Sequence, residues 1–174
     1  MLGPLVAGWL VALGARPGNG KTTLLLSLLS RLLEDRVPTL VFGTEMRPED
    51  LVKKWAAMRL GMDELDVFSG RIGAGDRDRV EREIVRLTEW DGLTFATTPR
   101  LDLGRLANEV RWAFDARTGP SPRALLLDHL HRITQDCEEL ELLAKELKEI
   151  AVERRVAFVA AAQLNREQGV GPFD

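Results

Sequence analysis

The chain has 174 residues, of which 45% are hydrophobic and 29% are charged, and this length and composition fit one globular domain with its own core. The net charge of −3 argues against a protein coated with positive charge for nucleic acid, although a local basic channel is compatible with it because net charge averages over all faces. The single cysteine, Cys137, excludes an internal disulfide, and no apolar run reaches the ~18 residues of a membrane span. We therefore expect a cytoplasmic protein without membrane contact.

Helical and strand patterns alternate along the chain. In order, they predict strand 9–13, a glycine loop, helix 24–35, strand 38–43, helix 48–60, loop 61–75 with one short turn, helix 76–90, strand 93–96, helix 103–114, strand 124–127, helix 137–150 and strand 156–161. This alternation predicts an α/β fold, with a mainly parallel twisted sheet of about five strands and helices on both faces.

The stretch between the first predicted strand and the first predicted helix is typical of a phosphate-binding P-loop. Glycines let the backbone curl so that successive N–H groups point toward phosphate oxygens, and the helix N-terminus adds partial positive charge. Lys21 would reach the β- and γ-phosphates of ATP, and the Thr22 hydroxyl would bind Mg²⁺. The predicted nucleotide-binding residues of this loop are Ala15, Arg16, Pro17, Gly18, Asn19, Gly20, Lys21, Thr22 and Thr23.

The loop departs from the strict P-loop pattern at its first position. The pattern requires a glycine where this chain has Ala15, and Gly14 lies one position too early. Alanine can serve at that position if its φ is ordinary. The alternative is a helix-capping turn that contains Gly-Lys-Thr by chance, which the flanking strand and helix disfavour.

Three polar residues follow the ends of predicted strands, where the ligand of a parallel sheet binds. Asp128 ends an apolar run, as in a Walker B strand, and would hold Mg²⁺ beside Thr22; alternatively it begins a loop. Glu45 could orient the water that attacks the γ-phosphate, or could cap the helix that starts near residue 48, and spacing alone does not decide between them. Gln163 could bind the γ-phosphate or the attacking water; taken alone, it would be a surface glutamine.

Histidine and tryptophan invite two other hypotheses. His129 and His131 are two residues apart and could mimic a metal pair, but no further histidine or cysteine pair completes a zinc site, so we interpret them as pocket-edge residues. The four tryptophans, at positions 9, 55, 90 and 112, are spread along the chain. We interpret them as core or interface residues and not as a platform for stacking bases.

Taken together, these segments resemble the RecA-like ATPase core of DnaB-type replicative helicases. The resemblance covers most of the chain and rests on residues 15–23, 43–46, 98–99, 125–130, 143–147 and 163–166. Many families share the P-loop. The Thr-Glu-Met sequence after the second strand and the Gln-Leu-Asn-Arg sequence after the fifth are much more specific.

The resemblance implies a role for each matching residue. Glu45 matches the catalytic glutamate, Lys21 and Thr22 match the phosphate and magnesium residues, Asp128 matches the Walker B aspartate, and Gln163 matches the glutamine that couples the nucleotide to a DNA-facing loop. It further implies ATP and Mg²⁺ as cofactors, and a homo-oligomeric ring, usually a hexamer, with ATP between subunits and single-stranded DNA in its centre. The loops after residues 128 and 163 would carry Arg132 and Arg166 toward that DNA.

The chain also departs from the family. We expect residues 1–174 to form a single ATPase domain, without the family's N-terminal primase-contacting domain and without the later segment that carries its arginine finger. The interval between residues 128 and 137 is short for a DNA-contacting loop of this family. Two alternatives therefore stay open: a RecA-like regulatory or recombination-accessory ATPase that does not unwind DNA, and a nucleotide-gated assembly module.

Overall fold

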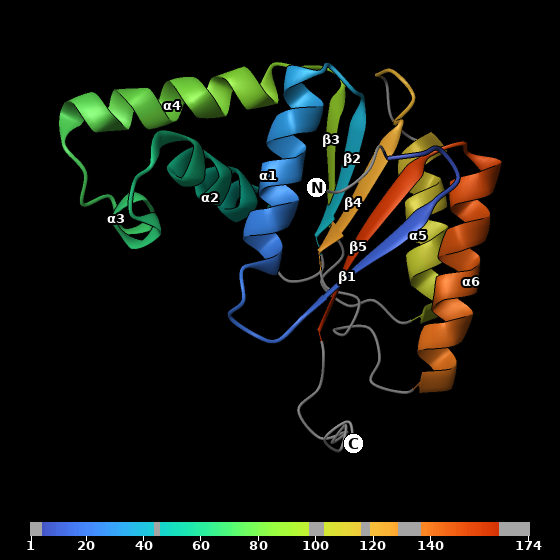
Figure 1. Ribbon diagram of the computed structural model, residues 1–174. Helices are drawn as coiled ribbons and strands as arrows, with labels where there is room; N and C mark the ends of the chain where they lie inside the picture. The colour runs from blue at the N-terminus through green and yellow to red at the C-terminus, as the bar shows by residue number, and fades with distance from the viewer. Residues whose placement is uncertain (1–4, 44–45, 98–102, 116–118, 129–136, 164–174) are drawn as a thin grey trace.

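The computed structural model describes residues 5–43, 46–97, 103–115, 119–128 and 137–163. Five parallel strands form one sheet in the order β1-β5-β4-β2-β3 (Figure 1). The strands are β1 (Leu10–Ala15), β2 (Thr39–Gly43), β3 (Leu93–Thr97), β4 (Ala124–Asp128) and β5 (Ala157–Gln163). The helices are α1 (Lys21–Glu34), α2 (Pro48–Leu60), α3 (Glu64–Ser69), α4 (Ala74–Thr88), α5 (Leu103–Asp115) and α6 (Cys137–Glu153). The predicted α/β fold with a five-stranded parallel sheet is confirmed.

Apolar side chains alternate between the two faces of the sheet. In β4, Leu126 packs in a cluster with α1, α2 and α4, whereas Leu125 and Leu127 pack in a second cluster with α5 and α6. Figure 1 shows the same division, with α1 to α4 on one side of the sheet and α5 and α6 on the other. Because successive side chains of a strand point to opposite faces, a continuous apolar run buries both faces of the sheet. None of the helices in the described ranges has the length and apolar character needed to cross a membrane.

The strand register brings distant parts of the chain to one edge of the sheet. At the carboxyl ends of the strands, Ala15 of β1 is paired with Gln163 of β5, and Gly43 of β2 is paired with Asp128 of β4. The P-loop leaves this edge directly after Ala15. The sheet therefore collects at one edge the positions that the sequence marks for chemistry.

The prediction of a loop over residues 61–75 was wrong for much of that segment. Residues Glu64–Ser69 form α3, and α4 begins at Ala74, two residues before its predicted start. The Asp63 side chain accepts a hydrogen bond from the Asp66 N–H at 3.1 Å, and Gly70 ends α3 with a φ of +71°. Such a short helix gives little periodicity to read, and its stability comes from these caps and from burying Val67.

Substitution of Leu126 tests the packing of the central strand. Leu126→Ala should lower the free energy of unfolding by about 2–5 kcal/mol, because the side chain is 2% exposed and its loss leaves a cavity. Leu65→Ala is the matched control, since Leu65 is 70% exposed and its loss should change stability by no more than about 0.5 kcal/mol. Urea denaturation measures both; equal losses in the two variants would contradict this account of the core.

Candidate nucleotide site

The P-loop has a backbone conformation that depends on two glycines. Gly18 and Gly20 have φ of +77° and +75°, in the left-handed region that L-residues rarely adopt. Gly20 is the N-cap of α1 and receives no side-chain capping bond. Its carbonyl accepts the N–H of Leu24 at 2.9 Å, so the amides of the preceding first turn have no partner within the helix. An uncapped helix N-terminus of this kind favours an anion.

Lys21 lies in the first turn of α1 and is held by the loop itself. Its side chain is buried, and Nζ donates to the carbonyl oxygens of Ala15 and Arg16 at 3.0 Å and 3.1 Å. Among the described residues other than glycine, only Arg36 and Arg155 have a positive φ. Ala15 therefore has the ordinary φ that lets alanine replace the usual glycine at this position. The contacts of Lys21 could not be predicted from the sequence, because every residue has a main-chain oxygen and its position leaves no sequence signal.

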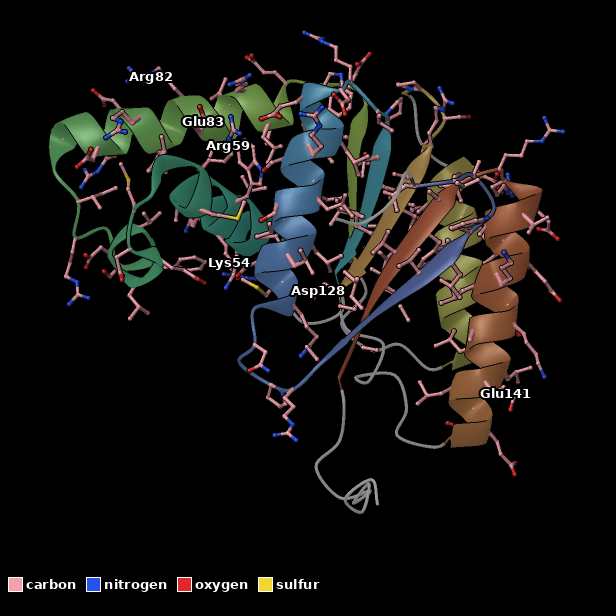
Figure 2. All side chains as sticks on the ribbon, viewed as in Figure 1. Lys54, Arg59, Arg82, Glu83, Asp128 and Glu141 are labelled. Atoms are coloured by element: carbon pink, nitrogen blue, oxygen red, sulfur yellow. The ribbon has the colours of Figure 1, made fainter. Side chains whose placement is uncertain are left out.

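Thr22 and Asp128 lie together, although they are 106 residues apart in the chain. The Thr22 hydroxyl donates to the Asp128 carboxylate, with Oγ1 at 3.1 Å from Oδ2 and 3.3 Å from Oδ1. Asp128 is labelled in Figure 2. Asp128 is 3% exposed, and apolar side chains of α1, β2 and β4 lie behind the pair. Hydroxyl and carboxylate oxygens are the kind of ligand that Mg²⁺ prefers, so the donor set fits this ion.

The other predicted site residues divide into two groups. The side chains of Arg16, Pro17, Asn19 and Thr23 are exposed, whereas Ala15 is partly buried. The backbone of Gln163 ends β5 opposite Ala15. Glu45, Arg132, Arg166, His129 and His131 lie outside the described residues. The structure thus brings together the P-loop, Thr22 and Asp128, and the roles of the other residues stay predictions.

An ion pair holds the chain where it enters α2, just after residues 44–45. Arg47 Nε and Nη2 donate to the Asp50 carboxylate at 3.0 Å and 3.3 Å. This hydrogen bond lowers the pKa of Asp50 below its ordinary value and raises the pKa of Arg47 above its own. Glu49 and Asp50 also place negative charge in the first turn of α2, where it favours the helix N-terminus.

A glycine loop at the carboxyl edge of a parallel sheet, with a buried lysine and a threonine–aspartate pair, defines the class of P-loop nucleotide-binding domains. The family model of the DnaB-like helicase C terminal domain matches residues 1–170. The chain therefore belongs to the DnaB-like helicase C-terminal domain family, and the resemblance inferred from its motifs is confirmed.

Curated relatives agree with this assignment. Over 162 residues the chain is 26% identical to the replicative DNA helicase DnaB of Nostoc sp. (strain PCC 7120), a match that covers 90% of this chain and 18% of the relative. Over 165 residues it is 25% identical to the replicative DNA helicase DnaB of Buchnera aphidicola subsp. Acyrthosiphon pisum, covering 90% of this chain and 35% of the relative. The chain thus spans well under half the length of these relatives.

Solved structures share the fold. A DnaB-like replicative helicase, solved in a study of its interactions with primase, superposes with a TM-score of 0.78 at 17% identity, over 98% of this chain and 42% of that chain. A second solved structure, that of an ATPase domain, superposes with a TM-score of 0.76 at 17% identity, over 91% of this chain and 58% of that chain. These likenesses confirm the RecA-like fold.

Substitution of Gly20 tests the loop conformation. Gly20→Ala should lower the free energy of unfolding by about 1–2 kcal/mol, because an L-residue is strained in the left-handed region. A Cβ at this position would meet only Thr23 Cβ, at 4.0 Å, so the cost is conformational and not steric.

Gly73→Ala is the matched control for this substitution. Gly73 is the N-cap of α4, has an ordinary φ of −63°, and leaves open space around an added Cβ. Its replacement should change stability by no more than about 0.5 kcal/mol, because the entropy gained by removing a glycine is offset by the preference for glycine over alanine at an N-cap. Thermal and urea unfolding compare the two variants, and an equal effect of both would exclude strain at Gly20.

Proposed function

We propose that this chain is the motor ATPase domain of a DnaB-like DNA helicase, which binds ATP with Mg²⁺ and couples ATP hydrolysis to movement on single-stranded DNA. The observation that carries the proposal is the contact between Thr22 and the buried Asp128 beside the P-loop, with Oγ1 3.1 Å from Oδ2. This contact joins the helix that follows the P-loop to the end of β4, which supports one shared Mg²⁺ site for the two predicted ligands.

The proposed role of Lys21 is to bind the β- and γ-phosphates of ATP. Its ammonium group rests on the carbonyl oxygens of Ala15 and Arg16, which are neutral acceptors. A phosphate oxygen carries more negative charge and forms a stronger, charge-assisted hydrogen bond, so the ammonium group can exchange one for the other without leaving the loop. The free amides of the first turn of α1 would bind the remaining phosphate oxygens.

Thr22 and Asp128 would hold Mg²⁺, which neutralises charge on the β- and γ-phosphates when it is bound. Glu45 follows β2 by two residues, and the end of β2 is paired with Asp128. From that position we propose that its carboxylate orients the water that attacks the γ-phosphate. Gln163 ends β5 beside the strand that leads into the P-loop, and we propose that its amide senses the γ-phosphate.

The family assignment also supports a proposal for assembly and partner. We propose a homo-oligomeric ring, usually a hexamer, with single-stranded DNA in its centre and with Arg132 and Arg166 contacting the phosphates of the DNA. An arginine of a neighbouring subunit would complete the site, as the resemblance implies for the family. The net charge of −3 requires that any DNA contact be local.

Replacement of Lys21 tests the nucleotide site. Lys21→Ala should lower steady-state ATP hydrolysis by about 100-fold or more, because it removes the positive charge placed on the transferred phosphate. Lys145→Ala is the matched control, since Lys145 is an exposed lysine of α6 paired with Glu141 at 3.0 Å. Normal nucleotide binding and hydrolysis by the Lys21→Ala protein would overturn the site assignment.

A salt series tests the DNA partner. In filter-binding assays with single-stranded DNA, the logarithm of the binding constant should fall linearly with the logarithm of the salt concentration. The slope should be about −0.7 for each phosphate contact. Arg132→Ala and Arg166→Ala should each make that slope shallower by about 0.7, the contribution of one phosphate contact. Arg79→Ala should leave the slope unchanged, because Arg79 is paired with Asp76 on α4. Single-stranded DNA should also stimulate ATP hydrolysis by the wild-type chain.

The second candidate function is a RecA-like regulatory or recombination-accessory ATPase. The net negative charge favours it, because it requires no phosphate-binding surface beyond the P-loop. Nucleotide binding and hydrolysis by a chain that neither binds single-stranded DNA nor is stimulated by it would select this function. Tight nucleotide binding with negligible hydrolysis would instead select a nucleotide-gated assembly module.

A further inference from the structure

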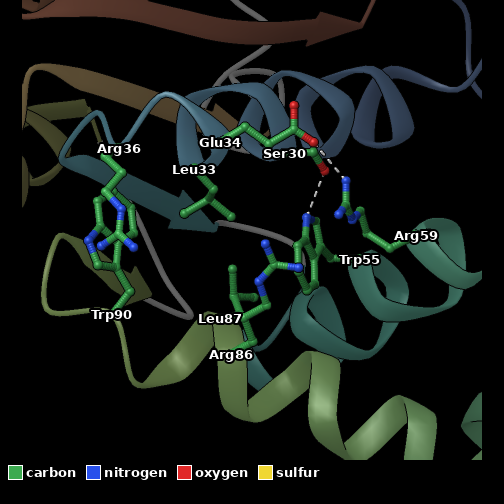
Figure 3. Close-up of a pocket in the computed structure, with 9 residues that line it drawn as sticks. All are labelled: Ser30, Leu33, Glu34, Arg36, Trp55, Arg59, Arg86, Leu87 and Trp90. Atoms are coloured by element: carbon green, nitrogen blue, oxygen red, sulfur yellow. Dashed lines mark hydrogen bonds and ion pairs between the residues drawn. The ribbon is translucent and has the colours of Figure 1, made fainter.

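A second cavity lies at the opposite end of α1 from the P-loop. It has a volume of about 230 Å³ and forms where α1, α2 and α4 meet (Figure 3). Four of its lining residues are apolar or aromatic: Trp55 and Leu87 are 3% and 2% exposed, and Leu33 and Trp90 are partly buried. The other five are polar or charged, namely Ser30, Glu34, Arg36, Arg59 and Arg86. We call it the Trp-Arg cavity.

The Trp-Arg cavity is separate from the nucleotide site. The P-loop precedes Lys21, whereas the cavity is lined by the last turns of α1, including Leu33 and Glu34. A helix rises 1.5 Å per residue, so along α1 the cavity residues Ser30 and Glu34 lie about 14 Å and about 20 Å from Lys21. A ligand in the cavity would touch no residue of the P-loop.

The rim of the Trp-Arg cavity carries surplus positive charge. Three arginines and one glutamate line the cavity: Arg36, Arg59, Arg86 and Glu34. Arg59 is compensated, because its Nη1 lies 3.0 Å from Glu34. Arg86 reaches Glu83 only at 3.9 Å, and within the part of the chain that the structure describes Arg36 forms no ion pair. Two guanidinium groups therefore stand at the rim with weak or no compensation.

Two contacts hold the Trp55 ring at the floor of the cavity. The Trp55 indole N–H donates to Ser30 Oγ at 2.8 Å, and the Arg59 guanidinium lies 5.8 Å from the centre of the Trp55 ring. The polar atom of the indole is thus satisfied inside the protein, and its ring presents an apolar surface to the cavity. A ligand would need to supply an apolar group for this floor and an anionic group for the rim.

We propose that the Trp-Arg cavity binds an aromatic carboxylate. Its aryl group would lie between the two tryptophans and two leucines, and its carboxylate would accept hydrogen bonds from Arg36 and Arg86, whose planar guanidinium groups match carboxylate geometry. The volume is below the ~300–1,000 Å³ of ordinary ligand pockets and suits one ring.

Two sources could supply this chemistry, namely a free small acid or an aromatic residue at the carboxyl end of a peptide. The experiment uses 3-phenylpropionate for the first source and Gly-Gly-Phe for the second, with 3-phenylpropanamide as the neutral isostere. Intrinsic tryptophan fluorescence reports binding, since Trp55 and Trp90 line the cavity. The protein carries Trp9→Phe and Trp112→Phe, because those two tryptophans are 55% and 64% exposed and would dilute the signal.

The expected result is a saturable fluorescence change with at least one of the two acids, weakened by added salt, and a clearly weaker change with the amide. The tighter of the two acids identifies the source. The proposal would be overturned if neither acid gave a saturable fluorescence change, or if the acid and the amide bound with equal affinity.

Rim variants give an independent test. Arg36→Gln and Arg86→Gln should each weaken binding of the acid about tenfold, since each removes one charge-assisted hydrogen bond. Arg79→Gln is the control and should bind as the parent does, because Arg79 is paired with Asp76 and does not line the cavity. Lys21→Ala should also bind normally, which separates this proposal from the nucleotide site. Unchanged affinity in both rim variants would overturn the proposal.

Discussion

The contact between Thr22 and Asp128 is the constraint on which the nucleotide site depends. It joins the first turn of α1 to the end of β4, two segments 106 residues apart, and it does so on an apolar floor. A buried carboxylate is costly unless it is hydrogen-bonded, so the threonine hydroxyl and the aspartate stabilise each other's position. The same burial that makes Asp128 costly makes it an effective ligand for a cation, because charges interact more strongly away from water.

The parallel sheet explains why these two residues meet. Every strand runs in the same direction, so every loop that leaves a carboxyl end emerges at one edge. The apolar side chains of β2, β4 and β5 are used to bury both faces, which leaves the strand ends for polar residues. Glycine at positions 18 and 20 then turns the backbone so that the amides of α1 face the same edge. Fold and site thus follow from one pattern of strands.

Helix α1 has a different environment at each end. Its N-terminus carries the P-loop, with free amides and the buried Lys21. Its C-terminal turns pack against α2 and α4 around two tryptophans, beneath a rim of arginines (Figure 3). The helices α2, α3 and α4 lie between β2 and β3 in the chain and pack on the α1 face of the sheet (Figure 1). They build a second concave surface without disturbing the edge where the nucleotide site lies.

The sequence by itself determined the class of fold and the P-loop, because period-two and period-3.6 patterns of apolar residues and the glycine spacing are local properties of the chain. It also marked Asp128, since a polar residue directly after a buried strand is visible in one line of sequence. It could not determine that Lys21 rests on two main-chain carbonyls, that α3 forms from two caps and one buried valine, or that Trp55 and Trp90 share a cavity. Those features arise between residues far apart in the chain, or from main-chain atoms that every residue possesses, and only the tertiary structure brings them together.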